Sequence, residues 1–208
     1  MDTRGAQVGE KEDERLHVMV MSGSARVGSF NRKLAALAAS AARARGAQVT
    51  DVDLRALALP IYDGDLEAEA QPAGAFELRR LFATHTALII AAPEYNGFPT
   101  PLLVNALDWA TRPKAGEGLP SGLAAVNGTV LGLMSASPTA YGGVRGLIAL
   151  RSFAALTLGM LVVPPTLSVP KADAAFDADG RLVEAQHGQS LERVVAAVLK
   201  TASALRAA

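Results

Sequence analysis

Residues 86–97 read Thr-Ala-Leu-Ile-Ile-Ala-Ala-Pro-Glu-Tyr-Asn-Gly, and this stretch decides the fold class. The apolar run over 86–92 predicts a buried strand, and the segment that follows it predicts a helix over about 101–111. In an open α/β sheet, ligands bind at the carboxyl ends of the parallel strands. The polar and aromatic residues directly after this strand therefore mark a candidate ligand site: Pro93, Glu94, Tyr95 and Asn96.

Outward from this stretch, short apolar runs alternate with longer helical stretches. We expect strands over 16–21, 48–53, 129–134 and 160–163, and helices over 29–45, 74–84, 143–158 and 191–205. This alternation predicts an α/β fold with a doubly wound parallel sheet and helices on both faces. Periodicity alone leaves the flavodoxin-like and the Rossmann strand orders both open. We expect a single domain over 16–208, after a disordered leader over 1–15.

The composition excludes several classes of function. The 208 residues carry 20 Lys and Arg against 20 Asp and Glu, and they include no cysteine. Charge balance without a basic stripe argues against a nucleic-acid partner, and no apolar run is long enough for a membrane span. His17, His85 and His187 lie too far apart in sequence to form a metal-binding pair, so we expect no metal. These features fit a cytoplasmic protein without thiol chemistry.

A second polar segment, Ser22-Gly-Ser-Ala-Arg-Val-Gly-Ser-Phe-Asn31, follows the first predicted strand. Small residues before a helix N-terminus let backbone N–H groups surround an anion, and Arg26 adds a forked cation for phosphate oxygens. The segment has neither the spacing of a P-loop nor the G-x-G-x-x-G pattern of a dinucleotide-binding turn. The plainer alternative is that Ser29 only caps the helix and Arg26 is solvated.

Taken together, the two segments resemble the NADPH-dependent FMN reductase family. The family pattern G-S-x-R-x-x-S-x-N matches Gly23, Ser24, Arg26, Ser29 and Asn31. P-E-Y-N matches 93–96, and the helix that follows carries the L-x-N-A-L-D-W of 103–109. A loop with Ser and Gly after the fourth strand, over 135–143, is similar to a third family element. The family comprises flavodoxin-like enzymes, among them quinone, azo-dye and chromate reductases.

The resemblance implies a cofactor, a strand order and an assembly. It implies strand order 2-1-3-4-5, bound FMN, NADPH or NADH as electron donor, and a homodimer or homotetramer. The residues it assigns to the FMN phosphate are Ser24, Arg26, Ser29, Phe30 and Asn31. Those it assigns to the ribityl chain and the flavin ring are Pro93, Glu94, Tyr95, Asn96, Gly97, Ser135, Gly142 and Gly143.

The predicted activity is hydride transfer from NAD(P)H to the flavin and then to a small-molecule acceptor. Quinones, free flavin, azo compounds and metal oxyanions all stay open as acceptors. We name no catalytic residue, because the cofactor carries this chemistry and the hydride step requires no side-chain acid or base. The alternatives are a flavodoxin-like electron carrier, a flavin-binding or flavin-free module without turnover, and a Rossmann dehydrogenase.

Overall fold

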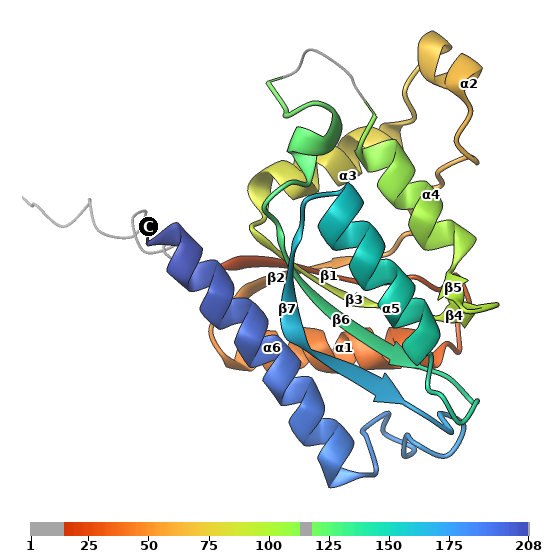
Figure 1. Ribbon diagram of the computed structural model, residues 1–208, viewed down its shortest axis with the longest axis vertical. Helices are drawn as coiled ribbons and strands as arrows, with labels where there is room; N and C mark the ends of the chain where they lie inside the picture. Colours follow the sequence, from red (N-terminus) through yellow and green to blue (C-terminus); the bar gives the residue numbers. More distant parts are fainter. Residues whose placement is uncertain (1–14, 113–117, 208) are drawn as a thin grey trace, which may run out of the picture.

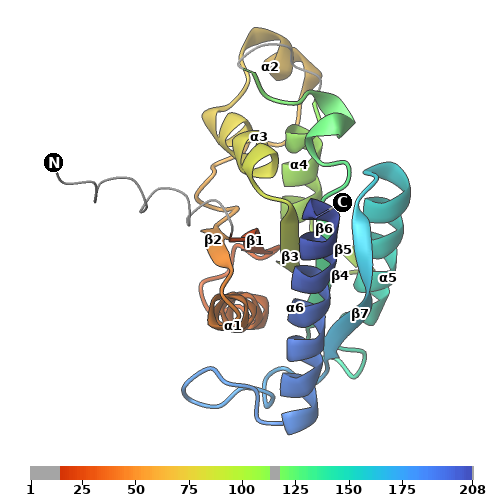
Figure 2. The same ribbon diagram turned by 90° about the vertical axis from the view of Figure 1, so that its left-hand side faces the viewer.

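The sheet order is the flavodoxin-like one. The computed structural model describes residues 15–112 and 118–207. Within them, five parallel strands lie in the order β2-β1-β3-β6-β7, which Figure 2 shows across the sheet. The strands are β1 (His17–Ser22), β2 (Gln48–Val52), β3 (Ala87–Ala91), β6 (Val130–Ala136) and β7 (Leu161–Val169). Because β6 and β7 are the fourth and fifth strands of this sheet, the predicted order 2-1-3-4-5 is confirmed.

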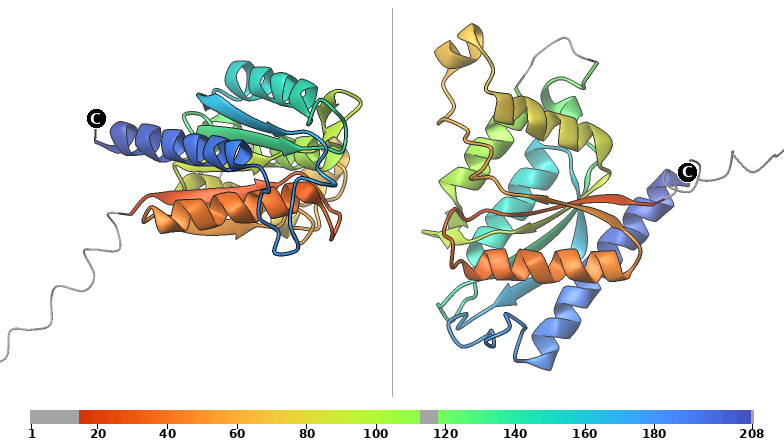
Figure 3. Two further views of the ribbon diagram at one scale, coloured as in Figure 1. Left: turned by 90° about the horizontal axis from the view of Figure 1, so that it is seen from below. Right: turned by 180° about the vertical axis from the view of Figure 1, so that it is seen from behind.

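Helices cover both faces of the sheet (Figure 1). The elements outside the sheet are α1 (Phe30–Ala44), α2 (Gly64–Glu69), α3 (Ala73–Thr84), β4 (Glu94–Tyr95), β5 (Phe98–Pro99), α4 (Pro101–Ala110), η1 (Gly122–Ala125), α5 (Val144–Ser152), η2 (Phe153–Thr157) and α6 (Ala185–Arg206). One core cluster joins α1 and α6 to the sheet, and these two helices meet in the right-hand view of Figure 3. A second cluster joins α3, α4 and α5 to the opposite face.

Helix α1 begins where the sequence predicts. The hydroxyl of Ser29 accepts the N–H of Asn31 at 3.2 Å and so caps the first turn. Leu34, Ala38 and Ala42 recur at helical spacing and are buried against the sheet. The helix ends before Gly46, which has a φ of 86°. A well-defined helix start therefore holds the polar segment over 22–31 at the carboxyl end of β1.

Strand β7 is longer than the predicted 160–163 and continues to Val169. Pro164 and Pro165 interrupt the apolar run, which is why the pattern indicates an earlier end. The strand tolerates both prolines because it lies at the edge of the sheet. The backbone N–H and carbonyl groups on its outer side have no neighbouring strand within the described residues, so a missing N–H there breaks no strand pairing. The Arg151 guanidinium donates to the carbonyls of Val163 at 2.9 Å and Pro164 at 3.2 Å, in the stretch where the register with β6 shifts.

Several local elements differ from the sequence prediction. The predicted helix over 143–158 divides into α5 and a π-helical turn, η2, and the closing helix begins at Ala185 instead of 191. The first turns of α6 are polar and lack apolar periodicity, so the sequence pattern places the start of this helix too late. Helix α2, η1 and the β4–β5 hairpin are not among the elements predicted from the sequence. The predicted leader over 1–15 lies outside the described residues except for Arg15.

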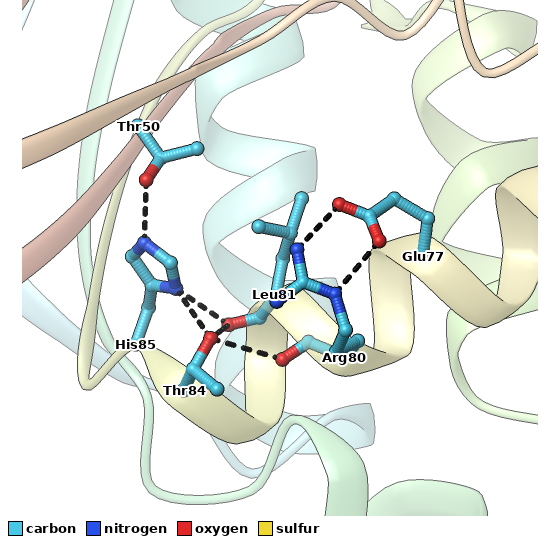
Figure 4. A network of polar contacts seen from close by, with 6 residues as sticks. All are labelled: Thr50, Glu77, Arg80, Leu81, Thr84 and His85. Carbon is cyan, nitrogen blue, oxygen red and sulfur yellow. Dashed lines mark hydrogen bonds and ion pairs between the residues drawn. The ribbon is translucent and has the colours of Figure 1, made fainter.

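A histidine links α3 to the edge strand β2. The His85 Nδ1 lies 2.8 Å from the Leu81 carbonyl oxygen, and its Nε2 lies 2.8 Å from the Thr50 hydroxyl (Figure 4). A carbonyl only accepts, so Nδ1 carries the proton and Nε2 accepts from Thr50 in the neutral ring. Burial lowers the pKa of His85 below its ordinary value of 6.5. This histidine is therefore a neutral structural residue.

No helix in the described ranges 15–112 and 118–207 is both long enough and apolar enough to span a bilayer.

Candidate active site

The two polar segments found in the sequence meet at the carboxyl edge of the sheet. They follow β1 and β3, which are neighbouring strands with Ser22 in register with Ala91. The Gly23 N–H donates to the Ala91 carbonyl at 3.0 Å. The Thr100 hydroxyl, at the start of α4, donates to the Gly23 carbonyl at 2.6 Å. The loop after β1 is thus fixed against the segment after β3.

A cavity of about 110 Å³ lies between the two segments. It is lined by eight residues named from the sequence, Ser24, Arg26, Ser29, Phe30, Asn31, Pro93, Glu94 and Tyr95, together with Ala136, Ser137 and Pro138. Ala136 is the last residue of β6, and Ser137 and Pro138 follow it. All three lie in the 135–143 loop predicted from the sequence, although only Ser135, Gly142 and Gly143 of that loop are named there as site residues. Asn96, Gly97, Ser135, Gly142 and Gly143, also named from the sequence, do not line this cavity.

The floor of the cavity is suited to an anion. The Ser29 hydroxyl accepts a hydrogen bond from the Asn31 N–H, and the Ser29 backbone carbonyl accepts one from the Lys33 N–H. Within the described ranges, the N–H groups of Phe30 and Arg32 have no acceptor, and the Arg26 guanidinium makes no ion pair. Free N–H groups, a helix N-terminus and an unpaired guanidinium together favour a phosphate. The N-terminus of α1 therefore combines a serine cap with free N–H groups that make it a candidate anion site.

The Asn31 side chain is a bridge between two elements. Its Nδ2 donates to the Ala136 carbonyl at 2.7 Å, and its Oδ1 accepts the Ala136 N–H at 2.9 Å. Both ends of the amide are thereby used to join α1 to the end of β6. Asn31 lines the cavity, but its hydrogen bonds in this structure hold the cavity wall. No sequence signal identifies this pairing, because the two residues are 105 positions apart.

The segment after β3 forms a tight hairpin. Strands β4 and β5 pair antiparallel, with Tyr95 opposite Phe98. Asn96 and Gly97 form the turn with φ values of 54° and 80°, both in the left-handed region. A two-residue Asn-Gly loop is a strong signal for this hairpin turn. The signal was present in the sequence and could have identified the hairpin, which projects beside α5 in Figure 1.

The Glu94 carboxylate anchors this hairpin to α5. One oxygen accepts the Gly146 N–H at 3.0 Å, and the other accepts Arg145 Nε at 3.0 Å. Burial by itself would raise the pKa of Glu94, but the Gly146 N–H and the Arg145 guanidinium outweigh it. The pKa therefore lies below its ordinary value, and Glu94 is a carboxylate at neutral pH. Glu94 acts as a positioning residue for the hairpin.

Ser135, Gly142 and Gly143 form a second close contact behind the hairpin. Ser135 is fully buried, and its hydroxyl has no hydrogen-bond partner. Gly142 and Gly143 have φ values of 58° and 85°, and a Cβ on Gly143 would collide with the Ser135 hydroxyl. The loop before α5 therefore needs glycine both for its backbone conformation and for space. These three residues are buried and do not line the cavity.

The arrangement fits a phosphorylated ring cofactor. The free N–H groups and Arg26 suit a phosphate, and the hairpin with Tyr95 supplies an exposed aromatic side chain and turn amides beside it. Together, the strand order and this edge site define a flavodoxin-like protein with a candidate cofactor site at the carboxyl edge of its sheet.

The chain belongs to the NADPH-dependent FMN reductase family, whose model matches residues 16–174. It is 31% identical over 173 residues to an NAD(P)H-dependent FMN reductase of Pseudomonas aeruginosa, covering 81% of this chain and 85% of that one. It is 30% identical over 169 residues to a 2-hydroxy-1,4-benzoquinone reductase of a Burkholderia species, covering 81% and 86%. A solved structure, the flavoenzyme NAD(P)H:(acceptor) oxidoreductase FerB of Paracoccus denitrificans, matches with a TM-score of 0.76 and 27% identity, covering 91% and 98%.

Proposed function

We propose that this chain is an FMN-dependent oxidoreductase that uses NAD(P)H to reduce a quinone. Family membership supports the flavin and the nicotinamide donor. The observation that carries the proposal is the cavity that the loop after β1 and the hairpin after β3 line together. When bound, FMN supplies the hydride chemistry, so the protein's task is to bind, orient and exclude water.

The proposed phosphate site is the floor of the cavity. Arg26 neutralises the phosphate charge, while the hydroxyls of Ser24 and Ser29 and the N–H of Phe30 donate to its oxygens. Asn31 contributes by holding Ala136 at the wall through its two hydrogen bonds. Ser137, the next residue after Ala136, also lines the cavity, so the two hydrogen bonds of Asn31 help to position it as well.

The proposed ring site is the hairpin and the loop before α5. Glu94 holds the hairpin at a fixed position through Arg145 and Gly146. This anchoring presents the Asn96–Gly97 turn, whose N–H groups are donors for the polar edge of the ring. Pro93 and Tyr95 border the ribityl chain and ring, and the Ser135 hydroxyl with Gly142 and Gly143 supports the ring from below.

The proposed acceptor is a quinone, since several relatives carry quinone reductase in their names. We further propose a cytoplasmic homodimer or homotetramer. Tyr95, Phe98, Tyr141 and Ile148 are each more than half exposed and lie on the hairpin, before α5 and on α5. Exposed apolar side chains gathered around a site favour a second subunit that covers it.

The test is a visible absorbance spectrum after FMN addition and desalting, followed anaerobically during NADPH addition and then a quinone. We expect retained flavin that NADPH bleaches and the quinone restores. Retained flavin that NADPH does not bleach would indicate an electron carrier, and no retained flavin would contradict the proposal.

The matched variants for this test are Arg26→Ala and Arg80→Ala. Arg26 has no ion pair in the described ranges, whereas Arg80 pairs with Glu77 on α3, outside the cavity. Loss of one charged phosphate contact weakens FMN binding by about tenfold or more, because charge-assisted hydrogen bonds contribute about 1.5–3 kcal/mol. Arg80→Ala should keep the wild-type affinity. Equal FMN affinity in the wild type and Arg26→Ala would refute the phosphate assignment.

A further inference from the structure

A larger cavity adjoins the proposed phosphate site. It has a volume of about 320 Å³ and lies between the first turns of α1 and the carboxyl half of the edge strand β2. Ser24 lines this cavity and the 110 Å³ cavity alike, so the two spaces are neighbours across one residue. The smaller cavity matches a phosphate, whereas the larger one is within the range of about 300–1,000 Å³ typical of small-molecule sites. The two cavities therefore share Ser24 as a common wall residue.

A buried hydroxyl in this cavity lacks a partner. Ser22 lines the cavity, is 9% exposed, and its Oγ has no hydrogen-bond partner. In a strand, alternate residues share a face, so Ser22 lies on the same face of β1 as Val20, which packs against α1. A buried hydroxyl without a partner is costly, and a ligand with a polar group in the cavity would satisfy it.

The cavity also presents a carboxylate at the end of β2. Asp53 follows β2 directly, and the Arg32 guanidinium binds it at 2.8 Å. Hydrogen bonding from Arg32 lowers the pKa of Asp53, so the side chain is an acceptor at neutral pH. In Rossmann sheets a carboxylate near the end of the second strand accepts hydrogen bonds from a ribose, and Asp53 lies at the comparable strand end of this flavodoxin-like sheet. Ala35 and Ala36 of α1 leave the remaining volume open for a flat apolar group.

The positive charge around the loop exceeds what one phosphate requires. Arg55 donates to the Ala25 carbonyl at 3.4 Å, which places its guanidinium against the outer side of the phosphate loop. Among the described residues, no carboxylate pairs with the Arg55 guanidinium. Arg26 lines the smaller cavity, and Arg55 contacts the same loop at Ala25. Two cations at one loop suit a pyrophosphate better than a single phosphate.

We propose that this cavity receives the adenosine monophosphate half of FAD, so that the protein binds FAD as well as FMN. The inference rests on the proposed phosphate site, because the phosphate on the flavin side must occupy the cradle of Ser24 and Arg26. The second phosphate then lies toward Arg55, the ribose hydroxyls meet Asp53 and Ser22, and the adenine packs over Ala36.

The test compares the two flavins on the apoprotein without any nicotinamide nucleotide present. Flavin fluorescence titrations give the dissociation constants of FAD and FMN for the wild type, and we expect them to agree within about tenfold. Ala36→Leu fills the cavity from an exposed helical position where leucine is well tolerated. We expect this variant to raise the ratio of the FAD constant to the FMN constant about tenfold. Ala204→Leu, on the exposed side of α6, is the matched control.

Each outcome decides one question. A wild-type FAD constant more than about tenfold above the FMN constant overturns the inference and leaves the proposed function intact. A ratio that Ala36→Leu changes by less than about threefold, or that Ala204→Leu changes equally, also overturns it. An unchanged ratio in Ala36→Leu, combined with a raised KM for NADPH in a separate turnover assay of that variant, overturns the inference and assigns the cavity to the adenosine of the nicotinamide nucleotide instead. A wild type that binds neither flavin contradicts the proposed function itself.

Discussion

Replacing Asn31 by alanine removes both hydrogen bonds that join α1 to the end of β6. The Ala136 N–H and carbonyl, which bind the amide at 2.9 and 2.7 Å, lose their side-chain partner. A buried group left without a partner costs about 1–3 kcal/mol, so two such groups set an upper limit of about 6 kcal/mol. Ala136 also lines the cavity, where water can replace part of the loss. We therefore expect Asn31→Ala to destabilise the protein by about 2–4 kcal/mol.

Urea unfolding of the apoprotein measures this change directly. A loss of this size lowers the melting temperature by roughly 5–15 °C for a chain of this length. Gln189→Ala, which removes an exposed amide on α6, is the control and should stay within about 0.5 kcal/mol of the wild type. A loss below about 1 kcal/mol in Asn31→Ala would refute the bridging role. FMN affinity should fall in the same variant, because the wall formed by Ala136 is no longer held.

Three further predictions concern the hairpin, the histidine network and the glycine loop. Glu94→Gln weakens the anchor made with Arg145, so FMN affinity measured by titration should fall about tenfold, whereas an unchanged affinity would exclude the anchoring role. The pKa of His85 is lowered in the folded state, so the unfolded chain binds the proton more tightly. The unfolding free energy should therefore decrease as pH falls below 6.5, and His85→Gln should lessen this slope in urea titrations; equal slopes would contradict it. Gly143→Ala should cost more than about 2 kcal/mol through its φ and the collision with Ser135, and a wild-type melting temperature would disprove that.

Much of the site follows from sequence because both polar segments come directly after buried strands. The ends of adjacent parallel strands meet at one edge, which explains why Ser24 and Tyr95 line the same cavity although they are far apart in sequence. The strand order itself required the family resemblance, since apolar periodicity is the same in both doubly wound orders. The β4–β5 hairpin could have been predicted from Asn96-Gly97.

The remaining features depend on contacts that no local pattern encodes. The Asn31 amide can donate to a ligand or to a backbone group, and only the fold shows that it binds Ala136. The partners of Glu94 likewise come from α5, about fifty positions away along the chain. The length of β7 was underestimated because Pro164 is unfavourable in most strands and acceptable only at an edge.

The outer edge of β7, with its two prolines and the Arg151 contacts, affects how copies of this chain can associate. Pro164 and Pro165 lack N–H groups, and the Arg151 side chain already occupies the carbonyls of Val163 and Pro164. These residues offer few free hydrogen-bonding groups to a strand of another molecule, so edge-to-edge pairing is disfavoured along this part of β7. Growth of the sheet from this edge, and with it the start of a fibrous aggregate, is therefore less favourable here than at an edge with regular free N–H and carbonyl groups.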